Sequence, residues 1–177
     1  MRVNSWVCGA LVLLAMVGVA IAGESQPCCA SPLPSNVDFQ PRDLEAQIVR
    51  IYERSPTFRS QCERIGAADS LRITVRIDTA IPNHYRAFSV IQRHGGQIRA
   101  EVHLPPSSDH SEMLAHEFEH ILEQIEGLDL RTLARIKGSG VREVQYDLFE
   151  SDRAQAVGRV VVAETDGRIR VREKVGD

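Results

Sequence analysis

Two kinds of hydrophobic spacing divide the chain into predicted strands and predicted helices. Apolar residues alternate with polar ones at 71–77 and 98–104, which is the period of half-buried strands. A third strand is predicted over 85–92, and the segment His94-Gly95-Gly96-Gln97 that follows it has the paired glycines of a β-hairpin turn. The helical period of 3.6 residues is found at 42–54, 57–65, 114–126, within 128–140, and at 145–164. This order predicts an α+β fold.

Composition and charge narrow the class of protein. The 177 residues suffice for one domain with a hydrophobic core, and 43% hydrophobic and 25% charged residues are typical of a soluble globular protein. The formal net charge is −3, and lysines and arginines are dispersed among acidic residues. A nucleic-acid-binding protein needs a basic face, so we expect no nucleic-acid partner.

The first 22 residues have the pattern of a secretory signal peptide. Arg2 is followed by an apolar run at 7–22 that ends in Ala20-Ile21-Ala22, a small-residue cleavage site. The run is short for a membrane span, although an uncleaved anchor is the alternative. We therefore predict a signal peptide (1–22), a secreted or periplasmic location, and no membrane association after cleavage.

The remaining chain is predicted to contain a proline-rich, flexible arm (23–40), a domain (41–164) and a polar tail (165–177). Export favours disulfide formation, and Cys28, Cys29 and Cys62 remain after the signal peptide is removed. A bridge from Cys62 to Cys28 or to Cys29 would attach the arm to the first helical region. A bridge between the two adjacent cysteines is strained and less favourable.

The helix predicted at 114–126 carries the sequence His116-Glu117-Phe118-Glu119-His120, an H-E-x-x-H motif. Residues four apart lie on the same side of a helix, so His116 and His120 can bind one ion. Glu117 is placed to act as general base toward a water that the ion activates, as in zinc peptidases. The alternative is that both histidines lie on a solvated helix face and bind nothing.

The same helix has recognisable ends in the sequence. Asp109 followed by Glu112 resembles a capping box at its start, and Gly127 is a typical glycine terminator. The motif is therefore predicted to lie on a well-defined helix.

A catalytic zinc ion usually has three protein ligands, so a third must follow the motif. The metzincin pattern requires Gly and His where this chain has Glu123 and Glu126, which excludes that class. A glutamate on a later helix is the other common solution. Glu150 is the best placed by sequence, and Asp147 and Glu143 are the alternatives.

The order of elements and these motif residues resemble the catalytic core of gluzincin metallopeptidases, above all the short minigluzincins. The resemblance covers about residues 41–164 and implies a minimal zincin-like α+β domain, with a small antiparallel or mixed sheet. An active-site helix and a helix bearing Glu150 would pack on that sheet. By analogy, His116, His120 and Glu150 are the zinc ligands and Glu117 is the catalytic base.

One position departs from the family pattern. Ala154 stands where the family often has an acidic residue, so Glu123, one turn after His120, is the candidate acidic partner of a ligand histidine. The resemblance also implies that strand 98–104 is an edge that pairs with an extended substrate; a plain surface edge is the alternative.

The oxyanion formed during hydrolysis needs a hydrogen-bond donor. Tyr146 and His103 are candidates for that role, whereas His84, His94 and His110 are interpreted as loop residues.

Together these observations predict an exported zinc-dependent metallopeptidase that acts on a peptide or protein substrate. The mechanism expected is hydrolysis by zinc-activated water with Glu117 as general base. The alternative is a non-catalytic protein that binds metal or a partner on the same scaffold. The sequence does not indicate an oligomeric state.

Overall fold

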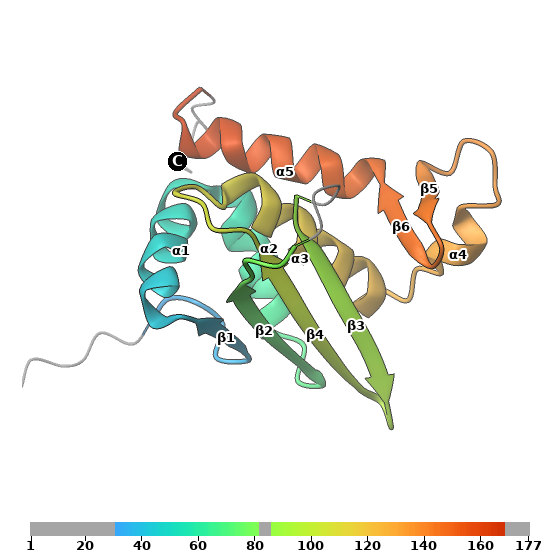
Figure 1. The fold of residues 1–177 in the computed structure, drawn as a ribbon, viewed down its shortest axis with the longest axis horizontal. Helices are drawn as coiled ribbons and strands as arrows, with labels where there is room; N and C mark the ends of the chain where they lie inside the picture. Colours follow the sequence, from blue (N-terminus) through green and yellow to red (C-terminus); the bar gives the residue numbers. More distant parts are fainter. Residues whose placement is uncertain (1–30, 82–85, 169–177) are drawn as a thin grey trace, which may run out of the picture. The chain divides into compact units, whose positions relative to one another are not determined.

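The central sheet has four strands in the order β1-β2-β4-β3 (Figure 1). The computed structural model describes residues 31–81 and 86–168. Strands β1, β2 and β4 are mutually parallel, and β3 runs antiparallel to β4. The domain is therefore α+β with a mixed sheet, as predicted. The strand bounds are β1 Val37–Gln40, β2 Leu71–Ile77, β3 Phe88–His94 and β4 Gln97–Leu104.

The hairpin between β3 and β4 decides which strand is at the edge of the sheet. Gly95 and Gly96 have φ angles of 55° and 81°, the pair of positive values that a type I′ turn requires. Strand β4 then pairs with β3 on one side and with β2 on the other. The prediction that 98–104 is an edge strand is wrong, because the parallel pairing with β2 joins segments that are distant in sequence. The edge strand next to β4 is β3.

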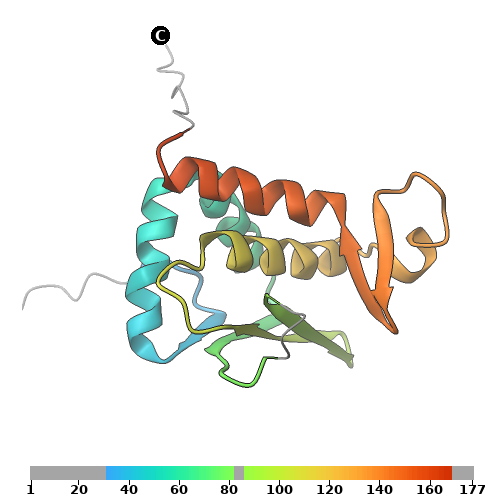
Figure 2. The same cartoon turned by 45° about the horizontal axis from the view of Figure 1, so that its top comes forward.

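One face of the sheet forms the core with the helices. Alternate residues of β2 and β4 are buried on this face, and α3 (Ser111–Ile125) covers it. Helix α2 (Pro56–Gly66) packs beside α3, where Phe58 of α2 stacks on Phe118 of α3 with ring centroids 5.6 Å apart. Helix α1 (Arg42–Arg54) packs against α2 and β1. Helix α5 (Asp152–Thr165) packs on α3 on the side away from the sheet (Figure 2).

Part of the segment predicted as a flexible arm belongs to the fold. Strand β1 pairs with β2, and the side chains of Leu33 and Phe39 are buried in the core. The Asn36 side chain donates a 2.8 Å hydrogen bond to the carbonyl oxygen of Ile65, which fixes the segment against α2. The prolines therefore accompany an ordered segment from residue 31 onward. The predicted signal peptide and the tail beyond residue 168 lie outside the described residues.

Cys62, on α2, has no disulfide partner among the described residues. Burial raises the pKa of the thiol to about 12, which keeps it protonated and unreactive. Its proposed partners Cys28 and Cys29 lie outside the described residues. Cys62 contributes to the core as a small apolar side chain.

The segment predicted as one helix over 145–164 begins instead as a hairpin. Strands β5 (Val141–Gln145) and β6 (Leu148–Ser151) pair antiparallel around a turn in which Asp147 has a φ of 57°. Helix α5 begins only at Asp152, because Ser151 is in extended conformation and its hydroxyl accepts a 2.9 Å hydrogen bond from the Ala154 amide. The short helix α4 (Leu130–Leu133) precedes the hairpin. Among the described residues, no helix is long and apolar enough to cross a membrane.

Candidate metal centre

Helix α3 is fixed at both ends. At its start the Asp109 carboxylate accepts hydrogen bonds from the Ser111 amide (2.8 Å) and hydroxyl (2.6 Å). The predicted capping box is absent, because the N-cap residue is His110, which makes no side-chain cap hydrogen bond, and Glu112 forms an ion pair with Arg86. At the end, Gly127 has a φ of 77°, and the amides of residues 127 and 128 bond the carbonyls of residues 124 and 123. This is a Schellman motif, which confirms the predicted glycine terminator.

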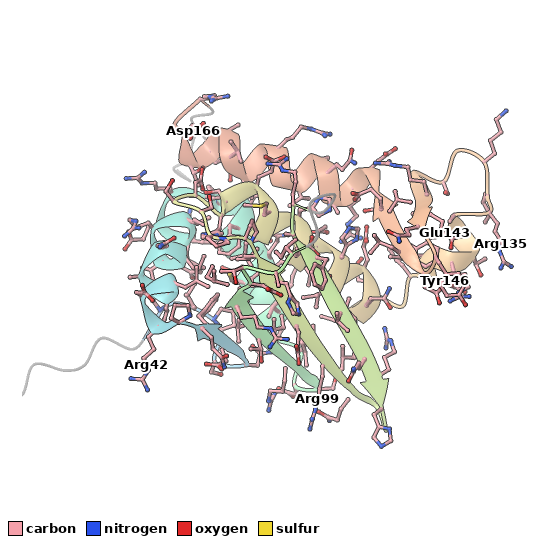
Figure 3. The ribbon with its side chains drawn as sticks, viewed as in Figure 1. Arg42, Arg99, Arg135, Glu143, Tyr146 and Asp166 are labelled. Atoms are coloured by element: carbon pink, nitrogen blue, oxygen red, sulfur yellow. The ribbon has the colours of Figure 1, made fainter. Side chains whose placement is uncertain are left out.

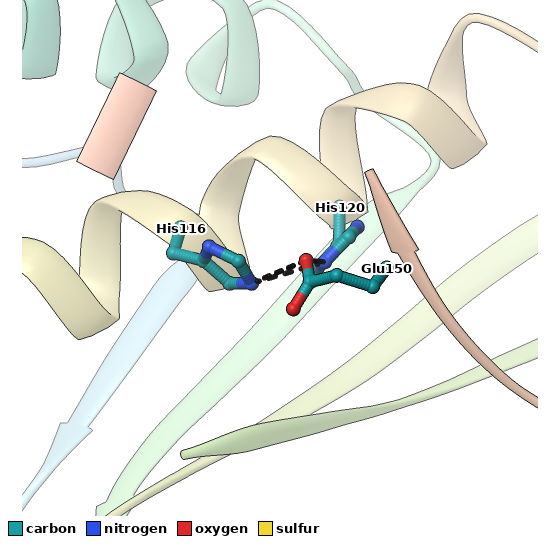
Figure 4. Close-up of side chains that lie close together, drawn as sticks. All are labelled: His116, His120 and Glu150. Atoms are coloured by element: carbon teal, nitrogen blue, oxygen red, sulfur yellow. Dashed lines mark hydrogen bonds and ion pairs between the residues drawn. The ribbon is translucent and has the colours of Figure 1, made fainter. Parts of the chain in front are cut away.

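Two turns of this helix and strand β6 bring together three side chains that could hold a metal ion (Figure 4). The Nε2 atoms of His116 and His120 are 3.2 Å apart. Glu150 Oε1 is 3.1 Å from the first nitrogen and 3.3 Å from the second. The sequence predicts one site for His116, His120 and Glu150, and the structure brings the three side chains together.

The spacing of these three atoms fits a small tetrahedral cation. With metal–ligand bonds of about 2.0 Å, adjacent ligand atoms of a tetrahedral zinc site are about 3.3 Å apart. The observed separations of 3.1, 3.2 and 3.3 Å are close to this value. Two imidazoles and one carboxylate could hold a metal ion and leave a fourth position open. This donor set is not specific to zinc, because other transition-metal ions accept it.

Glu150 reaches the site from a strand and not from a helix as predicted. It lies in β6, directly before the residue that caps α5. The two alternative ligands are on the same hairpin but elsewhere: Asp147 forms an ion pair with Arg131, and Glu143 accepts a 3.2 Å hydrogen bond from the Asp147 amide. The cap at Ser151 therefore anchors the strand end that presents Glu150.

Glu123 holds the second histidine in place. Its Oε2 atom is 2.9 Å from His120 Nδ1, while its Oε1 atom accepts a 2.6 Å hydrogen bond from the Ser151 hydroxyl. A carboxylate at Nδ1 favours a proton on that nitrogen and leaves Nε2 free for a metal. The contact expected between Glu123 and His120 is thus present. The contribution of Ser151 was missed, although a serine before a helical stretch is a signal for a cap.

Small residues let α5 approach α3 closely. Ala154 is fully buried, and a Cβ atom placed on Gly158 would lie 3.0 Å from the Glu112 carbonyl oxygen and 3.5 Å from His116 Cβ. A side chain at Gly158 would push the two helices apart. Glycine therefore allows the contact that seats α5 beside His116.

The side chain of Glu117, on α3, lies beside the edge strand β3. It is buried, and it forms a side-chain hydrogen bond with Ser89 of β3. Burial raises the pKa of the Glu117 carboxyl above its ordinary value, although His120 and His116 act in the opposite direction. A carboxylate with a raised pKa is better matched to accepting and returning a proton near neutral pH. Ser89 was not identified from the sequence, because only strand pairing brings it beside α3.

The three ligands and Glu117 line one cleft of about 920 Å³. Its walls are the edge strand β3, helix α3, the β5–β6 hairpin and helix α5. Strand β3, at the end of the strand order, thus borders the cleft that contains the candidate metal centre. A cleft of this size accommodates a short peptide or a ligand of similar size.

Neither predicted oxyanion donor belongs to this cleft. Tyr146 is 87% exposed at the tip of the β5–β6 hairpin (Figure 3). His103 lies on the opposite face of the sheet, where its Nδ1 atom is 2.8 Å from Asp78 and its ring stacks on Phe88.

The three histidines interpreted as loop residues lie in different parts of the chain. His110 is the last residue of the loop before α3, as predicted, but it is buried and hydrogen-bonded to the carbonyl of Pro105 at 3.0 Å. His94 is the last residue of β3, and His84 lies outside the described residues.

No protein-family model, curated protein or solved structure matches this chain. The arrangement of the site and the resemblance in its motif residues are therefore the grounds for assigning a function.

The electrostatics of the ligands predict that metal binding releases protons. Burial lowers the pKa of His120, but hydrogen bonds to Glu123 and Glu150 outweigh it and raise the pKa to about 10. Hydrogen bonds to His116 and His120 hold the pKa of Glu150 well below its usual range, against the effect of burial. Without metal, His120 is thus protonated at pH 6, and a metal ion must displace that proton.

At pH 6 we expect at least one proton to be released for each zinc ion bound. Zinc titration calorimetry in two buffers of different ionisation enthalpy measures this number. Because the raised pKa belongs to the folded state, protonated His120 also stabilises the metal-free fold below pH 6.5, and this contribution is lost as pH rises toward about 10. Equal binding enthalpies in the two buffers would contradict the assignment of His120 as a ligand.

Proposed function

We propose that this protein is a zinc-dependent peptidase of the gluzincin type, and that residues 1–22 act as a signal peptide for its export. The observation that carries the proposal is the triangle of His116, His120 and Glu150 ligand atoms beside a buried glutamate. Zinc is favoured among the metals because the ligand spacing suits a tetrahedral ion with bonds of about 2.0 Å. Calcium and magnesium prefer sites made wholly of oxygen ligands.

In the proposed reaction, the bound zinc ion would supply Lewis acidity toward the scissile carbonyl and toward the attacking water. The Glu117 carboxylate accepts the proton of this water and later delivers it to the nitrogen of the leaving amine. Burial of Glu117 serves this exchange, because its raised pKa lowers the cost of holding the proton in between. Ser89 orients the carboxylate through its hydrogen bond.

The edge strand supports a peptide as substrate. Among the described residues, strand β3 pairs with one strand, β4, and it borders the cleft beside Glu117. An extended chain that pairs with such an edge forms main-chain hydrogen bonds whatever its sequence, and this places its carbonyl groups along the cleft. Strand β3 would thus pair with the substrate, the role expected of 98–104.

A non-catalytic metal-binding or partner-binding protein on the same scaffold is the alternative. The buried Glu117 carboxyl and its contact with Ser89 favour catalysis over this alternative. Metal binding alone does not require a buried carboxylate next to the ligands.

The decisive experiment combines metal analysis with peptide hydrolysis. We expect the purified chain to hold one zinc ion and to cleave internally quenched peptides, to lose both properties with a chelator, and to regain both with added zinc. The variants His116→Ala and His120→Ala should hold no zinc, whereas His94→Ala, at the end of β3, should hold the wild-type amount. Unchanged stoichiometric zinc in the two ligand variants would overturn the site, and zinc without hydrolysis would favour the non-catalytic alternative.

A further inference from the structure

Among the described residues, Arg159 of helix α5 is the arginine of the cleft without a charged partner. Three arginines line the cleft: Arg86 forms an ion pair with Glu112, and Arg131 forms one with Asp147. Arg159 forms no hydrogen bond or ion pair with any residue of the part of the chain that the structure describes. An arginine that borders a cleft in this state is available to a ligand with a carboxylate, which it can bind through two parallel hydrogen bonds.

The packing of α5 places this arginine near one end of the cleft. Its neighbour Gly158 lies against Glu112 in the first turn of α3 and against His116. Arg86 pairs with that same Glu112. This end therefore carries two cationic side chains and one carboxylate, a net positive charge. At the hairpin side, Arg131 and Asp147 neutralise each other.

Strand β3 gives the cleft a direction. Arg86 stands two residues before β3 and pairs with the first turn of α3, whereas Arg93 near the end of β3 donates to the Gln124 carbonyl in the last turn. Strand β3 and α3 thus run the same way. A peptide that pairs antiparallel to β3, the slightly more stable mode, has its C-terminal side at the Glu112 end of the cleft.

The positive charge at the Glu112 end of the cleft and the direction of β3 favour the same orientation of a bound peptide. In the antiparallel mode a C-terminal carboxylate approaches the positive end, whereas the parallel mode would bring an N-terminal ammonium group there. Repulsion from the net positive charge of this end disfavours the second arrangement.

We propose that Arg159 is a specificity-determining residue that binds a substrate carboxylate on the C-terminal side of the scissile bond. The carboxylate is the free end of a peptide cut close to its C-terminus, or the side chain of Asp or Glu within a longer peptide. The proposal rests on the proposed function for the existence of a scissile bond. The contact between carboxylate and guanidinium does not depend on whether the bond is then cleaved.

The test uses pairs of internally quenched peptides built from Ala, Leu and Phe. In one pair the C-terminus is a free acid or a carboxamide; in the other, a blocked longer peptide carries Glu or Gln after the cleaved bond, which mass spectrometry of the products locates. We expect the zinc-loaded wild type to prefer the carboxylate member of at least one pair by about 10- to 100-fold in kcat/KM, mostly through KM. The pair that shows the preference identifies the source of the carboxylate.

The variant Arg159→Ala should reduce this ratio to about one, and Arg159→Lys should restore part of it. Arg135→Ala is the matched control, since Arg135 is exposed beside the β5–β6 hairpin and does not line the cleft (Figure 3), so its ratio should stay at the wild-type value. A wild-type ratio of one in both pairs, or a ratio that survives Arg159→Ala, would overturn the proposal.

If no peptide is hydrolysed, binding to the zinc-loaded protein is measured instead of the rate, by fluorescence anisotropy of the same sequences carrying the fluorophore without the quencher. Tighter binding of the carboxylate member that is lost in Arg159→Ala then supports the role of Arg159 while the hydrolytic function fails. Equal binding of both members of each pair overturns the role of Arg159 itself.

Discussion

The variant Glu117→Gln is expected to lower kcat for peptide hydrolysis by about 10³-fold while the protein keeps its zinc. The introduced amide has the size of the carboxylate but cannot accept a proton from the attacking water. None of the three ligand atoms is changed, so zinc content should equal that of the wild type. Steady-state kinetics on one quenched peptide and metal analysis of the same preparation measure both quantities.

The fold should tolerate this change, which separates loss of chemistry from loss of structure. Burial raises the pKa of Glu117, so its charged form is less favourable in the folded protein than in water. The midpoint of thermal unfolding should therefore be equal to or above that of the wild type. Glu101→Gln is the matched control, because Glu101 is exposed on β4 and pairs with Arg76 outside the cleft. Wild-type turnover by Glu117→Gln would refute the assignment of the base.

The second large effect is expected from Glu150→Ala, which should weaken zinc binding by about 10²- to 10³-fold. The change removes one of three ligand atoms and the negative charge that stands 3.1 and 3.3 Å from the histidine nitrogens. Competition with a chromogenic chelator measures the affinity. Stabilisation by zinc should shrink in parallel, because a bound metal raises the free energy of unfolding in proportion to the logarithm of its affinity.

The two rejected ligand candidates are natural controls for this variant. Glu143 and Asp147 belong to the same hairpin as Glu150, but they bond to each other and to Arg131. Alanine at either position should leave zinc affinity within about twofold of the wild type, as for surface positions generally. If Asp147→Ala or Glu143→Ala weakened zinc binding as much as Glu150→Ala does, the ligand set would have to be revised.

Local features of the chain are predictable from the sequence because their causes are local. The spacing of His116 and His120 follows from helix geometry alone, and the positive φ of Gly127 follows from the absence of a Cβ atom. The helices at 42–54 and 57–65 and the hairpin at Gly95-Gly96 likewise follow from neighbouring residues. Each of these features depends on contacts within about four residues.

Features that depend on distant pairing are harder to predict. The sequence predicts an edge strand at 98–104, but pairing with β2 puts it inside the sheet. The hydrophobic residues at 148 and 149 fit a helical period, yet they belong to β6, since the cap at Ser151 prevents the helix from starting earlier. The prolines of the arm predict flexibility, whereas burial of Leu33 and Phe39 decides its order from residue 31 onward.

The sequence by itself determined the helix that carries the H-E-x-x-H motif and the buried face of the sheet, because periodicity and motif spacing encode them directly. It left Glu150 as the first of three candidates for a third ligand. Only the tertiary structure decided that Glu150 comes from a strand, that β3 borders the cleft, and that Arg159 lacks a partner among the described residues there. The physical reason is that these properties arise from contacts between segments far apart in the chain. Their free energy depends on the whole packing arrangement, which no short window of sequence specifies.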